Sequence, residues 1–166
     1  MAAIAVRRAR PEDSEAMAAI MAEVAKEGFL GAEPPVDVAE RAERFREALL
    51  GPEPDAAMWV LDEAGAVVGH AGVRSRVSGV HSFGMAILPE ARGRGGGRAL
   101  LEAIVEHARA SGAHKVDLEV WVDNARAIAL YVSAGFEVEG VRRDHYRRRD
   151  GRLRSTLIMS RRLDAG

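Results

Sequence analysis

The sequence contains no cysteine, and this absence removes several kinds of chemistry at once. Disulfides, thiolate metal sites and a cysteine nucleophile are all excluded. The five histidines are scattered, and no two of them stand three or four residues apart, the spacing at which a helix places two ligands on one face. We therefore expect no metal site.

A long apolar run and an excess of charge are missing as well. Because no uninterrupted apolar stretch of about 18 residues occurs, we expect no membrane span. The net charge of −1 gives no support for nucleic-acid binding over the whole surface. The first residues lack the order of charged and apolar segments that a signal peptide has. The absence of cysteine fits a cytoplasmic protein.

Length and periodicity predict one domain of the α/β class. A chain of 166 residues with 48% hydrophobic residues suits a single domain over residues 1–166. Apolar spacing predicts helices over 11–27, 37–50 (stopped by Gly51 and Pro52), around 100–108 with an end near Gly112, and 124–134. Strands are predicted over 3–9, 57–61, 66–73, 80–88, 115–122, 136–146 and 153–160. The order β-α-α-β-β-β-α-β-α-β-β favours a mixed sheet with helices on both faces.

One strand-to-helix turn is especially rich in glycine and arginine. The glycines are Gly93, Gly95, Gly96 and Gly97, and the arginines are Arg92, Arg94 and Arg98. Glycine lets backbone N–H groups come close to a ligand, and the start of a helix attracts anions. The arginines add positive charge. This chemistry suits a pyrophosphate.

The glycine turn has three interpretations other than a pyrophosphate site of this kind. A P-loop is absent, because no Gly-Lys-Ser or Gly-Lys-Thr follows. A dinucleotide-binding fingerprint would need a glycine where Arg98 stands, although Asp117 and Glu119 lie where a ribose-binding acid could be. A flexible turn without a ligand is the third alternative.

Two motifs together resemble the GNAT superfamily of N-acetyltransferases. Arg92-x-x-Gly95-x-Gly97 is similar to the R/Q-x-x-G-x-G/A motif that binds the CoA pyrophosphate in this family. Further on, Asn124-x-x-Ala-x-x-x-Tyr131-x-x-x-Gly135-Phe136 resembles its second signature. The resemblance covers the chain from the first strand to Met159. It implies the GNAT fold, a mostly antiparallel, twisted sheet of about seven strands flanked by about four helices.

The resemblance also implies where acetyl-CoA would bind. The pyrophosphate site would comprise Arg92, Gly93, Arg94, Gly95, Gly96, Gly97 and Arg98. Backbone groups near Ala86 and Ile87 would pair with the pantetheine arm as an added strand. Asn124 would contact the pantetheine or the helix start, and the Tyr131 hydroxyl would face the sulfur. Gly96 departs from the family, which usually has an aliphatic residue there; a glycine could weaken the helix start by up to ~1 kcal/mol relative to alanine.

Acetyl transfer needs a neutral amine and a way to protonate the leaving thiolate. Tyr131 is the candidate general acid, with a core aromatic as the alternative. Glu119 is the candidate general base, because an acid in an otherwise apolar strand should be partly buried and its pKa raised. The alternatives are a surface acid and deprotonation through water, since an α-amine has a pKa of about 8.

The C-terminal region from Arg142 to Arg162 contains nine arginines. These arginines could lie on a solvated pair of strands, or they could contact an acidic substrate or the CoA 3′-phosphate. A third alternative is an RNA-binding surface, which the lack of interleaved aromatic residues disfavours. The resemblance suggests that His145, Tyr146 and the loop 29–36 line the acceptor pocket.

The implied activity is acetyl transfer from acetyl-CoA to a primary amine, by direct attack in a ternary complex. The acceptor would be a small molecule or a peptide N-terminus. The sequence looks closest to members that act on free L-amino acids or on ribosomal-protein N-termini, with phosphinothricin acetyltransferases as neighbours. Because many family members dimerise, a homodimer is expected. The alternative function is a non-catalytic module that senses acetyl-CoA.

Overall fold

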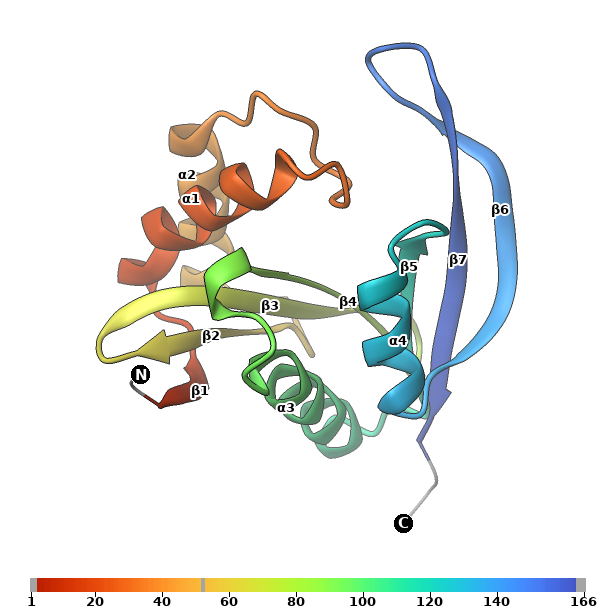
Figure 1. Cartoon of the computed structure of the whole chain (residues 1–166). Coiled ribbons are helices and arrows are strands. Elements are labelled where there is room, and N and C mark those ends of the chain that lie inside the picture. Colours follow the sequence, from red (N-terminus) through yellow and green to blue (C-terminus); the bar gives the residue numbers. More distant parts are fainter. Residues whose placement is uncertain (1–2, 52, 164–166) are drawn as a thin grey trace.

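Within residues 3–51 and 53–163, which the computed structural model describes, seven strands form one sheet and four α-helices pack against it (Figure 1). The helices are α1 (Ser14–Ala25), α2 (Val38–Leu50), α3 (Gly96–Ala110) and α4 (Ala125–Ser133). The strands are β1 (Ile4–Arg8), β2 (Ala57–Glu63), β3 (Ala66–Val77), β4 (Val80–Ile87), β5 (Lys115–Trp121), β6 (Glu137–Arg147) and β7 (Leu153–Arg162). The predicted order of elements is confirmed.

The element boundaries differ from the predicted ones by a few residues, for local reasons. Pro11–Asp13 form a 3₁₀ turn, so α1 begins only after it. β3 continues to Val77, because its pairing with β4 runs up to the turn at Gly79, where φ is +74°. Gly51 closes α2 as predicted, with its N–H bonded to the last turn. Pro52 and the ends of the predicted domain, residues 1–2 and 164–166, lie outside the described residues.

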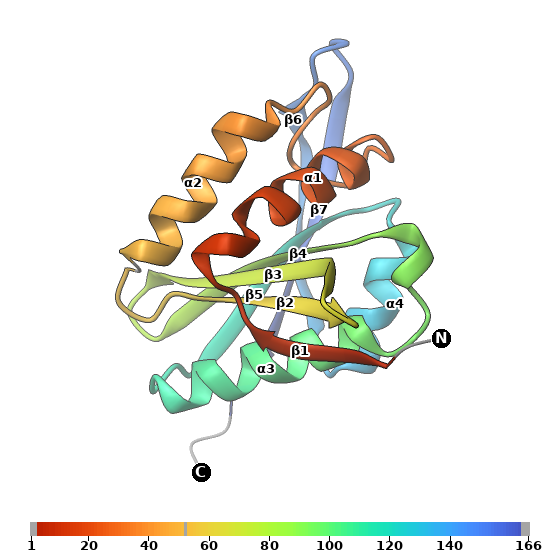
Figure 2. The ribbon, with the colours of Figure 1, turned by 90° about the vertical axis from the view of Figure 1, so that its left-hand side faces the viewer.

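The sheet is mixed, with a single parallel pair in its middle. Its strand order is β1-β2-β3-β4-β5-β7-β6, and all neighbours are antiparallel except β4 and β5. The parallel pair needs a crossover connection, and α3 provides it. Figure 2 shows α1 and α2 on one face of the sheet and α3 on the other. α4 shares the face of α3, because both helices contribute to the same core cluster.

The main core lies between the sheet and the face covered by α3 and α4. Alternate residues of β5 point into it: Val116, Leu118 and Val120 are buried. Their neighbours Asp117 and Glu119 therefore face the other side, where α1 and α2 lie. Neighbouring residues of β5 therefore contribute to opposite faces of the sheet, and the candidate site uses both faces.

The β6–β7 hairpin extends past the rest of the sheet, towards the loop after α1 (Figure 1). Its register shifts twice, once between Val138 and Gly140 and again between Arg142 and Tyr146. A bulge bends a strand and re-aims its side chains. The second shift brings Tyr146 back over the face that carries Glu119.

Candidate active site

The central feature of the site is an opening between β4 and β5. The two strands pair only over three positions, from Val80 with Lys115 to Ser82 with Asp117. At the last pair the Ser82 hydroxyl donates a hydrogen bond to the Asp117 carboxylate. Beyond it β5 continues alongside β7 while β4 stays with β3, so the strands separate. Asp117 is thus occupied at the closed end of the opening, which argues against its role as the ribose-binding acid of the dinucleotide alternative.

The backbone of β4 presents to this opening groups that do not pair with β3. The Leu88 N–H donates to the Val68 carbonyl at 3.0 Å, which sets the alternation of hydrogen-bonded pairs along β3 and β4. The N–H and C=O groups of Ala86 therefore point to β3, and those of Met85 and Ile87 point away from β3, although the Ile87 carbonyl already accepts from Arg92 Nε at 2.8 Å. Of the two strand residues predicted to face the pantetheine, Ile87 is so placed and Ala86 is not. Met85, which sequence reasoning missed, takes the other position.

The glycine turn lies at the open end of β4 and contains two kinds of glycine. Gly93 and Gly95 have φ angles of +73° and +86°, and a Cβ on either would meet nothing within 4 Å. α3 begins directly after Gly95, so the first N–H groups of the helix have no intrahelical acceptor. This pairing of open backbone and helix start is an anion site by geometry.

Gly96 and Gly97 instead permit close packing. A Cβ on Gly96 would lie 2.7 Å from Leu61 Cδ1, and one on Gly97 would lie 3.0 Å from Leu130 Cδ2. Leu61 is fully buried and fills the space that a side chain at position 96 would need. The departure from the family pattern at Gly96 therefore has a structural cause, since the missing aliphatic group is supplied by β2.

The three arginines of the turn are already engaged by other groups of the protein. Arg92 forms two hydrogen bonds of 2.9 Å with Glu27, and its Nε donates to the Ile87 carbonyl at 2.8 Å. Arg94 is bonded to Glu63. Arg98 donates to the Ser133 hydroxyl at 3.0 Å. The bonds from Arg92 and Arg94 hold the pKa of Glu27 and of Glu63 below the usual range. These arginines brace the turn, and the backbone supplies its free donors.

Tyr131 lies on α4 at the inner end of the opening. Its ring packs edge-on against Phe83, with centroids 5.8 Å apart, and Phe83 is the first β4 residue beyond the parallel pairing. Burial raises the pKa of Tyr131 to about 12, so the hydroxyl keeps its proton at neutral pH. Among the described residues, no group forms a hydrogen bond with this hydroxyl. Asn124 caps the same helix, where its side-chain oxygen accepts from Ala127 N–H at 3.3 Å.

Glu119 lies on the opposite face of the sheet from Tyr131. Its Oε2 accepts hydrogen bonds from the Tyr146 hydroxyl at 2.7 Å and from the Thr156 hydroxyl at 2.9 Å, while Arg142 stands 3.4 Å from Oε1. The side chain is 30% exposed, which agrees with the partial burial expected, and its covering neighbours come from β6 and β7. The side chains of β5 alternate between the two faces of the sheet, and Glu119 lies on the face towards α1 and α2. Burial and the bond to Glu119 raise the pKa of Tyr146.

Two of the partners of Glu119 could not be found from the sequence. Thr156 stands opposite Trp121 on β7 and is 3% exposed, and its position follows only from the pairing of β5 with β7. Arg142 was one of many arginines with no sign to single it out. Tyr146, which was expected to line the acceptor pocket, is hydrogen-bonded to Glu119, and His145 Nε2 lies 3.4 Å from Arg142.

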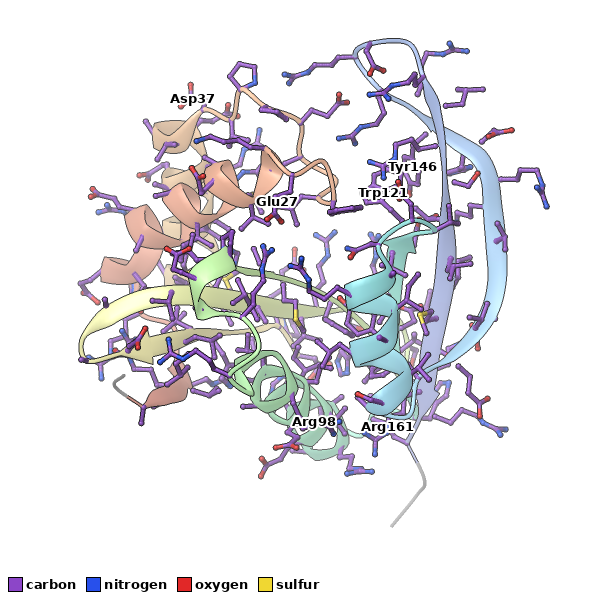
Figure 3. All side chains as sticks on the ribbon, viewed as in Figure 1. Glu27, Asp37, Arg98, Trp121, Tyr146 and Arg161 are labelled. Atoms are coloured by element: carbon purple, nitrogen blue, oxygen red, sulfur yellow. The ribbon has the colours of Figure 1, made fainter. Side chains whose placement is uncertain are left out.

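A surface groove of about 680 Å³ lies between α3 and the end of α4. Arg98 and Arg161 border it, and Figure 3 shows both near the lower ends of these elements. Neither Tyr131 nor Glu119 lines this groove, so it is not where a bond would be made or broken. Arg98 places one end of the groove beside the glycine turn, and the groove continues along α3 past Glu102 and Glu106 to Arg109.

Comparisons with known proteins agree with this geometry. A family model described as the acetyltransferase (GNAT) family matches residues 18–136. The chain is similar to a GNAT superfamily phosphinothricin acetyltransferase from Sinorhizobium meliloti in complex with AcCoA, with 28% identity, a TM-score of 0.83, and coverage of 96% of this chain and 88% of that one. It is also similar to yncA from Salmonella typhimurium with its cofactor acetyl-CoA, with 25% identity, a TM-score of 0.83, and coverage of 99% and 96%.

A third similar structure is the ribosomal-protein-alanine N-acetyltransferase from Brucella melitensis, with 26% identity, a TM-score of 0.83, and coverage of 96% of this chain and 99% of that one. A search of the curated proteins found no match. No helix in the described part of the chain is long and apolar enough to cross a membrane. In the same residues, no group of three or more His, Asp or Glu side chains is arranged to hold a metal ion.

Proposed function

The chain belongs to the GNAT family of acetyltransferases, and we propose that it transfers an acetyl group from acetyl-CoA to a primary amine, with a small amine or an amino acid as acceptor. The observation that carries this proposal is the opening between β4 and β5, which is lined by the β4 backbone groups that do not pair with β3 and is flanked by the glycine turn. Two proteins with a similar overall structure bind acetyl-CoA. With no cysteine to hold an acyl group, attack is direct in a ternary complex.

The residues around the opening would hold acetyl-CoA, which supplies the activated thioester. Met85 and Ile87 would pair with the pantetheine arm by adding it to the sheet edge. The N–H groups at the start of α3, from Gly95 to Arg98, would hold the pyrophosphate. The end of the groove beside Arg98, next to the glycine turn, would receive the nucleotide end, since Glu102 and Glu106 line the groove further along α3 and would repel a phosphate there.

Tyr131 would act on the sulfur side of the reaction. A phenol with a pKa of about 12 is a weaker acid than a thiol, whose pKa is usually about 8.5. Tyr131 therefore stabilises the developing sulfur charge mainly as a hydrogen-bond donor, and its unpaired hydroxyl is available for that bond. Burial makes such a bond stronger than it would be in water.

Glu119 would act on the amine side. Its Oε2 is oriented by Tyr146 and Thr156, whereas Oε1 has only the long contact with Arg142. An ammonium group that displaces Arg142 could form a short hydrogen bond with Oε1 and lose its proton there or through a water molecule. Because Tyr131 and Glu119 lie on opposite faces of the sheet, acceptor and cofactor would approach the opening from different sides.

The test is thiol release from acetyl-CoA across a panel of free amino acids, N-terminal peptides, polyamines, aminoglycosides and phosphinothricin. Turnover with one class supports the proposal and identifies the acceptor. Binding of acetyl-CoA with no turnover on any amine would favour the sensing module instead. Absence of both would refute the assignment of the glycine turn.

We also propose that residues 1–166 act as a single N-acetyltransferase domain without a metal. The homodimer and the cytoplasmic location stay predictions, and analytical ultracentrifugation would measure the first of them directly. A monomer at all concentrations would contradict it.

A further inference from the structure

The arginine-rich hairpin is bonded to a loop more than 100 residues away in the sequence. Three of its arginines donate hydrogen bonds to backbone carbonyls of the loop between α1 and α2. The pairs are Arg154 with Gly28, Arg148 with Gly31 at 3.1 Å, and Arg149 with Pro34 at 3.0 Å. We call these three arginines the arginine bridge. The three contacts are spaced along the loop, at Gly28, Gly31 and Pro34, so the loop and the hairpin are joined at three points.

Trp121, the last residue of β5, anchors the bridge. The guanidinium carbons of Arg154 and Arg148 lie 4.3 Å and 5.1 Å from the centre of the Trp121 ring. The indole N–H donates to the Leu30 carbonyl at 3.3 Å. Trp121 is only 5% exposed, so these cation–π contacts are largely shielded from water. The loop is thus held by the rigid end of a central strand as well as by the hairpin.

Two of the three bridge arginines are paired with carboxylates. Arg148 lies 3.6 Å from Glu33, whose other oxygen accepts from the Arg149 backbone N–H at 3.0 Å. Arg154 is paired with Asp123 at 2.7 Å. The guanidinium groups of Arg148 and Arg154 are thus committed to partners within the protein, which argues against an acidic substrate or RNA as their ligand. This part of the arginine-rich region therefore connects the hairpin to the loop, a role that its composition did not indicate.

The bridge lies directly beside the proposed acceptor side of the site. Trp121 packs edge-on against Tyr146, with centroids 5.3 Å apart, and the Tyr146 hydroxyl is bonded to Glu119. Figure 3 shows Trp121 and Tyr146 together, facing the loop that follows Glu27. We propose that the arginine bridge makes the loop 28–36 a fixed wall of the acceptor site and selects small amines over polypeptide N-termini. This inference rests on the proposed function.

The physical reason is steric. In this proposal a polypeptide would enter between the loop and the hairpin, so that its first residue reaches Glu119 while the rest of the chain remains outside. The bridge closes that passage at three points, whereas a small amine needs no exit for a continuing chain. Arg148 and Arg154 are accordingly positioning residues, since they touch the loop and Trp121 and not the reacting atoms.

The experiment compares Arg154→Ala and Arg148→Ala with a matched control, Arg143→Ala. Arg143 is an exposed arginine of the same hairpin, and the structure gives it no hydrogen bond or ion pair with another described residue. For each protein, kcat and KM are measured with the best small amine and with a peptide that carries the same amine at its N-terminus. The dissociation constant of acetyl-CoA is measured by calorimetry.

We expect KM for the small amine to rise about tenfold in both bridge variants, because the wall is formed in a smaller fraction of molecules. The ratio of kcat/KM for the peptide to that for the small amine should also rise about tenfold, while acetyl-CoA affinity stays within about twofold of the wild type. Chymotrypsin cleavage after Phe29 should become faster. Arg154→Lys should restore little, since an ammonium group cannot reproduce the planar, forked contact.

Two results would overturn the inference, and they differ from a failure of the proposed function. Unchanged amine kinetics and unchanged cleavage at Phe29 in both bridge variants would show that the bridge does not hold the wall. A wild-type protein that prefers the peptide to the small amine would refute the selectivity. If the wild type turned over no amine at all, the proposed function would fail, and this inference with it.

Discussion

Gly95→Ala separates the role of the glycine turn in phosphate binding from its role in stability. Gly95 has φ +86°, a conformation that favours glycine, and its Cβ would project into open space at the start of α3. An alanine there should destabilise the fold by roughly 1–2 kcal/mol through backbone strain. It should also disturb the N–H groups that would hold the pyrophosphate.

The structure offers a control with the same strain and no such role. Gly112 has φ +75°, its Cβ would also meet nothing within 4 Å, and it follows the other end of α3. At 1.5 Å per residue, the two glycines are about 25 Å apart. Gly112→Ala should therefore lose a similar amount of stability and bind acetyl-CoA as the wild type does.

Affinity is the quantity that distinguishes the two variants. Loss of one charge-assisted hydrogen bond, worth about 1.5–3 kcal/mol, should raise the acetyl-CoA dissociation constant of Gly95→Ala by roughly tenfold to a hundredfold. Calorimetry measures the affinity, and urea unfolding measures the stability. Wild-type affinity in Gly95→Ala, or an equal loss in both variants, would refute the phosphate role of this turn.

Three further predictions follow from other parts of the molecule. Tyr131→Phe should lower kcat about a hundredfold, with little change in acetyl-CoA affinity; an unchanged kcat would leave Tyr131 as a core aromatic. Burial lowers the pKa of His70 to about 4 from its usual 6.5, so the unfolded state binds more protons below pH 6.5 and stability should fall by about 2 kcal/mol from pH 7 to pH 5. Urea unfolding of His70→Gln should show a smaller loss over this range, and an equal loss would exclude His70 as the cause. Gly96→Ala should be destabilising in the wild type but tolerated with Leu61→Ala, so a double-mutant cycle should give a coupling of about 1 kcal/mol or more, and independent effects would contradict the packing explanation.

The strands and helices were predictable because they depend on local patterns. Alternation and helical spacing of apolar residues, together with breakers such as Gly135, act over a few residues and are readable in one dimension. Gly135 has φ +84° after α4, as its position at the helix end predicted. The glycine turn and the second motif are local too, which is why the resemblance to the acetyltransferases could be recognised on a single sequence.

The side-chain partners of the site were not predictable, because they join distant segments. Arg92 was expected at a phosphate and is bonded to Glu27, 65 residues earlier. Glu119 was expected to be partly buried, and its bonded neighbours Tyr146 and Thr156 come from β6 and β7, which the sequence of β5 does not indicate. The backbone orientation of Ala86 depends on the hydrogen-bond register between β3 and β4, which the sequence of β4 alone does not contain.

The sequence by itself determined the order of elements, the glycine turn and the chemistry that its residue types permit, because these depend on backbone preferences and on spacing along the chain. Only the tertiary structure decided that β4 and β5 separate after three pairs, that Tyr131 and Glu119 lie on opposite faces of the sheet, and that arginines of the last hairpin hold the loop after α1. Each of these features depends on contacts between segments that are far apart in the sequence and meet only in the folded protein. The free energy of such contacts cannot be inferred from the residues of any one segment, because tertiary packing overrides local propensity.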